Sequence, residues 1–436
     1  MRRRFPVLLL SAALATTTAA VVVDRPTPPA AADVAALSSA LAPPVDLSTG
    51  RSTEDGTRLR PAGSDPSTWQ TSDRVIGPHV TPRAARTLAR ATVEREYRYR
   101  VAPGVVASAY RETSAERRIR YHVLTAKWRK PGVGIRVAHP SAVARTAPTT
   151  RMVRRTRDGV AGVNGDFFDI GDTGAPLGVG VDEGRLVNGR TSGWNAGFYL
   201  DARGVPRIGQ VPVTIAIGNR AQVAVTNFNS AQVMPNGIGI YTPAWGTTSG
   251  FRWTDGQRRD VRMLRVEDGR IVEKRTVFPA GQEFTGRILV ARGALPAAQF
   301  DALAVGDRVR TTGRPAEGIR TAVTGNEIVL DKGEVLATED SELHPRTAIG
   351  IDRQRGRIIL LVVEGRQESS DGYTMVEVAK KLRSLGAVAG LNLDGGGSST
   401  LAGLREDRIR LLSSPSDGRQ RPVANALVVA YHRPGD

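Results

Sequence analysis

The residues best suited to chemistry follow a short apolar run near the C-terminus. Asp394 comes directly after residues 388–393, and three glycines and two serines follow it. A carboxylate at the end of a buried strand lies at the sheet edge where α/β sites collect. Glycines let backbone N–H groups approach an anion closely, and serines add hydroxyl donors. The pattern predicts an acid beside an oxyanion or phosphate, with an ordinary capped turn as the alternative. The candidate anion donors are Gly395, Gly396, Gly397, Ser398 and Ser399.

A second carboxylate ends the preceding apolar run. Residues 357–364 read RIILLVVE, which is typical of a strand buried on both faces, and Arg366 follows two positions later. If this strand pairs in parallel with 388–393, Glu364 and Asp394 lie at the same sheet edge. Two carboxylates at one edge are the minimum for glycoside hydrolysis. Arg366 could hold a phosphate through two hydrogen bonds, or could form only a surface ion pair with Glu364.

Two more segments contain polar residues that are candidates for the site. The run GVNGDFFD at 162–169 contains Asn164 and a third carboxylate, Asp166, beside two adjacent phenylalanines. A turn capped by packed aromatic rings is the alternative interpretation of this run. Arg346 and Thr347 precede a further predicted strand, and the arginine is a candidate for a second anion contact.

Missing residues and motifs exclude several classes of enzyme. The chain has no cysteine, which excludes disulfide scaffolds, thiolate metal sites and cysteine nucleophiles. No HExxH, Walker A or GxSxG motif occurs, which excludes zincins, P-loop enzymes and standard serine hydrolases. Of the five histidines, only His344 lies near the candidate segments in sequence.

The elements that must position these residues can be predicted from hydrophobic periodicity. Strand patterns dominate from about residue 119 onward, with a hairpin turning at Asp268 and Gly269. Residues 357–393 have the size of one strand–helix–strand unit. We expect helices over residues 81–100, 295–303 and 373–385.

The N-terminal residues indicate the cellular compartment of the protein. Residues 2–4 are arginines, 5–15 are mostly apolar, and 18–20 are small, which is the pattern of a secretory signal peptide. An uncleaved anchor is the alternative, and only then would a membrane be a partner. The sequence therefore predicts a secreted or cell-wall-associated bacterial protein.

The positive charge is concentrated in the first third of the chain. The net charge is +18, and residues 1–160 hold 27 Lys or Arg against 12 Asp or Glu. Outside the cell, an anionic wall polymer suits this segment, whereas nucleic acid does not. A merely solvated basic surface is the alternative. The predicted organisation is a signal peptide over 1–23, a disordered Ala/Pro/Ser/Thr-rich linker over 24–66, a basic, partly helical lead-in over 67–104 and a catalytic domain over 105–432.

Taken in order, the candidate segments resemble the phosphodiester glycosidase family. The matching text is GVNGDFFD (162–169), PLGVGVDEGRLV (176–187), PRTAIGID (345–352), VVEGR (362–366), the run 372–400 ending in LNLDGGGSST, and PSDGRQRPVANALVV (415–429). The resemblance implies an α+β domain whose mixed β-sheet has flanking helices. It implies Asn164, Asp166, Arg346, Glu364, Arg366, Asp394, Ser398 and Ser399 as site residues. Relatives often have Asp at position 364, and many have Asn near Ser413 and Ser414.

The activity that the resemblance implies is cleavage of a sugar 1-phosphodiester at the C1–O bond. The products are a free sugar and a phosphomonoester, which leaves without strong protonation. We expect Asp394 as the leading catalytic carboxylate, with Asp166 and Glu364 as alternates, and phosphate contacts from Arg346, Arg366 and the 395–399 loop. The substrate would be a phosphorylated carbohydrate such as an envelope phosphoglycan. No cofactor is required, although an acidic cluster could also hold a divalent cation. A non-catalytic binding module for anionic glycans and a hydrolase of ordinary glycosidic bonds are the alternatives.

Overall fold

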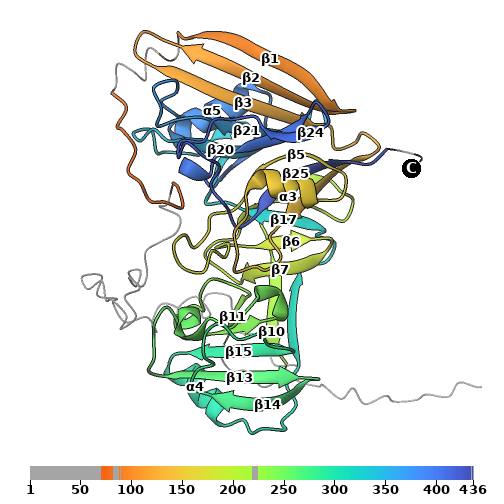
Figure 1. Ribbon diagram of the computed structural model, residues 1–436, viewed down its shortest axis with the longest axis vertical. Coiled ribbons are helices and arrows are strands. Elements are labelled where there is room, and N and C mark those ends of the chain that lie inside the picture. The colour runs from red at the N-terminus through yellow and green to blue at the C-terminus, as the bar shows by residue number, and fades with distance from the viewer. Residues whose placement is uncertain (1–69, 82–87, 89, 219–223, 434, 436) are drawn as a thin grey trace, which may run out of the picture. The chain divides into compact units, whose positions relative to one another are not determined.

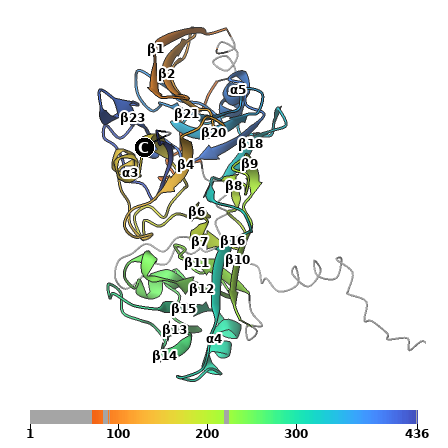
Figure 2. The same ribbon diagram turned by 90° about the vertical axis from the view of Figure 1, so that its right-hand side faces the viewer.

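The computed structural model describes residues 70–81, 88, 90–218, 224–433 and 435. The predicted signal peptide and linker lie outside these residues. The described strands form four sheets, which Figure 1 and Figure 2 show from two directions. Within this part of the chain no helix is long and apolar enough to cross a membrane.

The sheet that carries Asp394 at its edge has eight strands. In spatial order they are β1 (Thr92–Ala102), β2 (Val105–Thr113), β3 (Arg118–Ala126), β21 (Arg357–Val363), β20 (Arg346–Asp352), β22 (Ala389–Leu393), β18 (Glu327–Asp331) and β19 (Glu334–Val335). Each neighbouring pair is antiparallel. The pairs β1–β2, β2–β3, β20–β21 and β18–β19 join consecutive strands through short hairpin connections, whereas β3–β21 and β22–β18 pair strands far apart in the chain.

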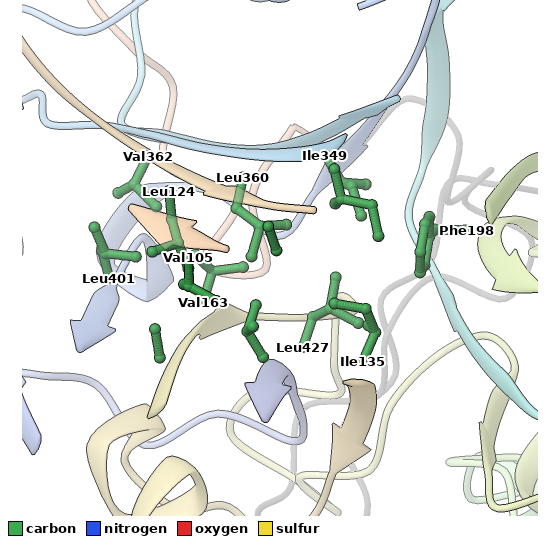
Figure 3. Packing of buried hydrophobic residues seen from close by; sticks show 14 of the residues in the cluster. Val105, Leu124, Ile135, Val163, Phe198, Ile349, Leu360, Val362, Leu401 and Leu427 are labelled. Atoms are coloured by element: carbon green, nitrogen blue, oxygen red, sulfur yellow. The ribbon is translucent and has the colours of Figure 1, made fainter. Parts of the chain in front are cut away.

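A five-stranded sheet packs against this one. Its strands are β24 (Arg408–Leu411), β23 (Leu401–Arg405), β5 (Gly159–Asn164), β25 (Ala426–Tyr431) and β4 (Val133–Ala138). Buried aliphatic side chains of both sheets form one core, which Figure 3 shows from close by. Leu124 and Leu360 come from the larger sheet, and Val163 and Leu427 come from the smaller one. Each such side chain contributes about 1.5–3 kcal/mol when fully buried, so this core holds the two sheets together.

Helices cover the outer faces of the two sheets. The helix α5 (Met375–Ser384) packs Val378 and Leu382 on the eight-stranded sheet, and α3 (Thr149–Arg155) packs Val153 on the five-stranded one. A capping box starts α5: the Thr374 side chain accepts from the Glu377 N–H, and the Glu377 side chain accepts from the Thr374 N–H. The predicted helix over 373–385 is therefore confirmed.

The remaining strands form a ten-stranded sheet and a small ribbon. The larger sheet contains β14 (Arg270–Arg275), β13 (Val261–Glu267), β15 (Arg287–Arg292), β12 (Gly237–Tyr241), β11 (Val225–Phe228), β7 (Arg185–Arg190), β6 (Gly180–Asp182), β17 (Thr321–Thr324), β8 (Ala196–Leu200) and β9 (Pro206–Gln210). The ribbon pairs β10 (Val213–Ile217) with β16 (Thr311–Pro315). The helix α4 (Ala294–Asp301) confirms the helix expected over 295–303, and β13–β14 is the predicted hairpin.

Three expectations about the fold were wrong. The fold is mostly β rather than α+β with flanking helices, since the described chain has 25 strands but only three α-helices. The described sheets are antiparallel except for the β11–β12 pair of the ten-stranded sheet. The eight-stranded sheet that carries Asp394 is therefore not a mixed sheet built on a strand–helix–strand unit. β21 and β22 do run in the same direction, but β20 lies between them and pairs with both. A single sequence run cannot reveal a strand that inserts from elsewhere in the chain.

The third error concerns the helix expected over 81–100. From Thr92 onward this segment is β1, whose residues pair with β2 from Thr92 opposite Thr113 to Ala102 opposite Val105. Alternating tyrosines and charged residues in TVEREYRYR suit a half-exposed strand, and this pairing outweighs the helical tendency of the arginines. The eight-stranded sheet therefore begins within the segment expected as a basic lead-in.

Candidate active site

Asp394 lies at the end of β22, where the two packed sheets meet. Its side chain is fully buried. Oδ1 accepts a hydrogen bond of 2.9 Å from the Ser72 N–H, whereas Oδ2 has no partner among the described residues. Burial raises the pKa of Asp394 to about 7, and this is opposed by the Ser398 hydroxyl and by Ser72. An acid with a free oxygen and a pKa near neutrality can change its charge during a reaction.

The side chains of Asn164 and Thr347 form hydrogen bonds around the backbone of Asp394. The side-chain amide of Asn164 donates to the Asp394 carbonyl over 2.6 Å. Its oxygen accepts from the Thr347 hydroxyl over 2.7 Å and from the Thr400 N–H over 3.0 Å. These bonds tie the end of β5 to the start of β20 and to the glycine loop. Both predicted residues are thus present at the site as positioning residues.

Asp166 is also buried, but its oxygens are already engaged. Oδ1 accepts from the Trp194 indole over 3.0 Å, and Oδ2 accepts from the Gly178 N–H over 2.9 Å and from the Thr324 hydroxyl over 2.8 Å. Burial raises the pKa of Asp166 to about 7 despite these donors. The three bonds tie the 162–169 run to the neighbouring sheet, so the geometry supports a structural role for this carboxylate.

Glu364 follows β21 at the same edge as Asp394, as predicted from the two apolar runs. Its Oε1 lies 2.7 Å from Nε2 of His122 and accepts from the Ser414 N–H over 2.7 Å. The other ring nitrogen of His122 lies 3.1 Å from the hydroxyl of Tyr97. Oε2 of Glu364 has no partner within the described chain. The expectation that His344 alone among the histidines lies near the site was wrong, because β3 brings His122 beside β21.

The two predicted arginines lie at the ends of neighbouring strands: Arg346 begins β20, and Arg366 follows β21. Arg346 is fully buried, and burial lowers its pKa to about 10. Its Nη1 has no hydrogen-bond partner among the described residues, so it can still donate. Arg366 has a φ of 57°, a left-handed conformation that is uncommon outside glycine. Its Nη2 donates to Nδ1 of His344 over 2.8 Å, and burial with the nearby arginine charges lowers the pKa of His344 to about 4, which keeps that ring neutral.

The glycine loop forms a single turn of 3-10 helix, η4 (Gly396–Ser398), and some of its backbone N–H groups are engaged within the protein. The Gly396 N–H donates to the carbonyl of Pro345, and the Ser399 N–H donates within the loop. Only the Gly397 N–H points to an anion, the Asp73 carboxylate at 3.4 Å. Gly397 also packs against Arg421 so closely that any side chain would overlap it.

A segment from the N-terminal side of the domain lies directly on these residues. We call residues 70–75 the N-terminal strap. The Gln70 side chain accepts from Nη2 of Arg346 over 2.5 Å, and the Ser72 hydroxyl accepts from the Phe168 N–H over 3.0 Å. Together with the Ser72–Asp394 bond, these contacts place the strap across the candidate catalytic acid.

Asp73 of the strap supplies the anion that the site binds. Its carboxylate lies 3.1 Å from Nη1 of Arg366 and 3.0 Å from Nη2 of Arg421. Burial would raise the pKa of Asp73, but hydrogen bonds from Thr71 and Arg366 outweigh it and hold the pKa well below its usual range. Two arginines and the Gly397 N–H therefore form an anion site beside Asp394.

Sequence reasoning missed several residues that the structure brings here. They are Ser72, Asp73, His122, Trp194, Thr324, Arg421 and Asn425. Arg421 and Asn425 lie within the quoted 415–429 run, which was a usable signal. His122 and Asp73 stand in segments without a motif, so only the fold reveals them. Across the described chain, no three His, Asp or Glu side chains gather as a cation site would require.

Comparison with known proteins places this geometry in a family context. Residues 262–430 match the family model described as phosphodiester glycosidase. An uncharacterized protein YomE, derived from the SPbeta prophage of Bacillus subtilis (strain 168), is 35% identical over 88 residues. That match covers 20% of this chain and only 13% of the relative.

Solved structures share the fold. A hypothetical protein from Synechocystis superimposes with a TM-score of 0.62 at 23% identity, over 76% of this chain and 63% of that one. A candidate exported protein from Burkholderia pseudomallei K96243 also gives 0.62, at 16% identity, over 82% of this chain and 98% of that one. The pro-peptide-inhibited catalytic domain of zebrafish N-acetylglucosamine-1-phosphodiester α-N-acetylglucosaminidase gives 0.42 at 16% identity, over 82% and 96%. The family-model match confirms the resemblance seen in the sequence motifs over residues 262–430 of the chain.

Proposed function

We propose that this protein hydrolyses a sugar 1-phosphodiester at the C1–O bond and releases a free sugar and a phosphomonoester. The observation that carries the proposal is the pairing of a buried acid, Asp394, with an adjacent anion site made by Arg366, Arg421 and Gly397. The Asp73 carboxylate fills that site and stands in for a phosphate, since both present charged oxygens to the same donors.

The reaction follows from this arrangement. Water attacks C1, the C1–O bond breaks, and its electron pair leaves with the phosphate, whose charge the two arginines stabilise. Ionised Asp394 stabilises the positive charge that develops on the sugar or accepts the proton of the attacking water. A phosphomonoester needs no strong acid to leave, so the scheme requires only one catalytic carboxylate. No cofactor enters this scheme.

The N-terminal strap and the substrate compete for one place in this proposal. A phosphate can reach Arg366 and Arg421 only after Asp73 has left them. The strap therefore has to move or be removed before turnover. Export and an anionic envelope phosphoglycan as substrate belong to the same proposal, supported by the signal-peptide pattern and by the positive charge of residues 1–160.

The test is product analysis after incubation with UDP-N-acetylglucosamine and with a methyl-phospho-sugar, with and without chelator. We expect free sugar and phosphomonoester from a phosphodiester, and no release from a neutral glycoside. Cleavage of the neutral glycoside would favour an ordinary glycosidase. Failure to cleave any of the three, by a protein from which the strap has been removed by limited proteolysis, would favour a binding module.

A further inference from the structure

An open cleft of about 450 Å³ adjoins the anion site. It is formed by three segments: residues 144–146 before α3, residues 168–174 after β5, and residues 417–422 before β25. The cleft is open while the strap is in place, so it is distinct from the space that Asp73 fills. Its volume lies within the roughly 300–1,000 Å³ that is usual for small-molecule sites.

The charge of the cleft is unbalanced. Asp172 pairs with Arg252 at 3.2 Å, and Asp417 pairs with Arg421 at 2.7 Å. The exposed side chains of Arg145 and Arg419 form no hydrogen bond or ion pair with any described residue. Two cations over a concave surface, with both acids already neutralised, fit an anionic group of a ligand.

The floor of the cleft is suited to a sugar or polyol. Phe168 and Ile170 line it together with Pro422, and backbone around Gly171 and Gly174 is open to solvent. Apolar and aromatic surface with a few polar groups is the usual lining of a carbohydrate or small-molecule pocket. The cleft therefore combines a weakly apolar floor with a cationic rim.

The position of the cleft shows which part of a substrate it faces. It shares Arg421 with the anion site and includes Phe168, whose N–H donates to Ser72 of the N-terminal strap. Asp394, Arg346 and Asn164 do not line it. The sugar whose C1 reacts must lie at Asp394, and the phosphate must lie at Arg421. The cleft then lies beyond the phosphate, on the side of the group that the phosphate carries.

We propose that this cleft binds the phosphate-borne group of the substrate, and that Arg145 and Arg419 bind a second negative charge one unit further along. The proposal rests on the proposed function and narrows it. The substrate class is a chain with repeated acidic groups, such as a polymer of polyol phosphates bearing 1-phospho-linked sugars, rather than an isolated phosphodiester.

The first experiment compares two substrates with the same sugar 1-phosphate. One carries methyl on the phosphate, and the other carries a glycerol phosphate dimer with further negative charge. We expect the R145Q/R419Q double variant to lose about tenfold in kcat/KM, through KM, on the dimer substrate only. The matched control is R185Q/R203Q, which removes two exposed arginines outside the cleft. An equal loss on both substrates, or no loss on either, would overturn the proposal.

A binding measurement separates this proposal from the proposed reaction. Titration calorimetry follows a sugar-free glycerol phosphate oligomer added to the full chain at about 50 mM and about 500 mM salt. We expect binding that weakens with salt and that R145Q/R419Q weakens by about tenfold. If the oligomer binds in this way but neither substrate is cleaved, the reaction is wrong and the cleft assignment holds. If the methyl substrate is cleaved but the oligomer does not bind, the cleft assignment alone is wrong.

Discussion

One carboxylate oxygen of Asp73 lies 3.1 Å from Nη1 of Arg366, although 293 positions separate the two residues in the chain. The pair is mostly buried, with 11% and 16% of the respective side chains exposed. The arginine guanidinium can donate two parallel hydrogen bonds to a pair of charged oxygens, and both a carboxylate and a phosphate present such a pair. The position of Asp73 therefore shows where this site holds an anion, here a carboxylate of the chain itself.

Replacing Asp394 with Asn removes the charge that the reaction needs while keeping the shape of the side chain. We expect kcat to fall by about 10²–10⁴-fold. The amide oxygen can still accept from Ser72, so the midpoint of thermal unfolding should stay close to the wild-type value. Product release and a melting curve check the two parts. The matched control is D268N in the β13–β14 turn, which should change neither, and an active D394N would remove Asp394 from the mechanism.

The rate should rise with pH and level off above about pH 7. Burial raises the pKa of Asp394 to about 7, so the group is protonated and inactive below that pH and ionised above it. No protonated acid is needed for the phosphate to leave, and the arginines stay charged. The profile of kcat between pH 5 and 9 checks this expectation. A rate that falls across pH 7 would instead assign Asp394 as a proton donor.

Asp73→Asn should activate the full chain. The substitution removes the negative charge that Arg366 and Arg421 bind, so the strap competes less with a phosphodiester. We expect KM to fall several-fold with little change in kcat. Asp73→Glu is the control, since it keeps the charge and should remain close to wild type. If D73N raises KM, the strap assists substrate binding rather than competing with it.

Gly397→Ala tests the anion site without touching a charged group. An added Cβ would overlap Nη2 of Arg421 and the carboxylate of Asp417. Both are ends of side chains that can move, so stability should change little while Arg421 shifts and KM rises. Gly209→Ala is the control, because no atom lies within 4 Å of its added Cβ. Unchanged KM in G397A would exclude Arg421 from phosphate binding.

His122→Ala should destabilise the site edge. It leaves Oε1 of Glu364 and the Tyr97 hydroxyl without the buried ring that both contact. We expect the free energy of unfolding to fall by about 1–3 kcal/mol, measured by urea denaturation. His122→Gln retains a donor for Glu364 and should lose less. Equal stability of the alanine variant and the wild type would show that the Tyr97–His122–Glu364 chain contributes nothing.

Much of the site could be predicted because its residues end apolar runs. Asp394 and Glu364 follow two recognisable strands, and those strands do deliver them to one edge. The strand β20 between them could not be predicted, because pairing depends on residues far apart in sequence. His122 could not be predicted for the same reason, because it lies beside Glu364 only when β3 pairs with β21. The helix expected from Pro82 onward failed at Thr92, because pairing with β2 outweighed local propensity.

The placement of β25 has a consequence for how the protein is made. This strand, the last one described, is an inner strand of the five-stranded sheet, hydrogen-bonded to β5 on one side and to β4 on the other. During synthesis, β4 and β5 leave the ribosome long before β25 and have no central partner until it arrives. The five-stranded sheet is therefore complete only after β25 has emerged. Until then this part of the polypeptide stays unfolded, and an unfolded chain is what a translocation channel for unfolded proteins accepts.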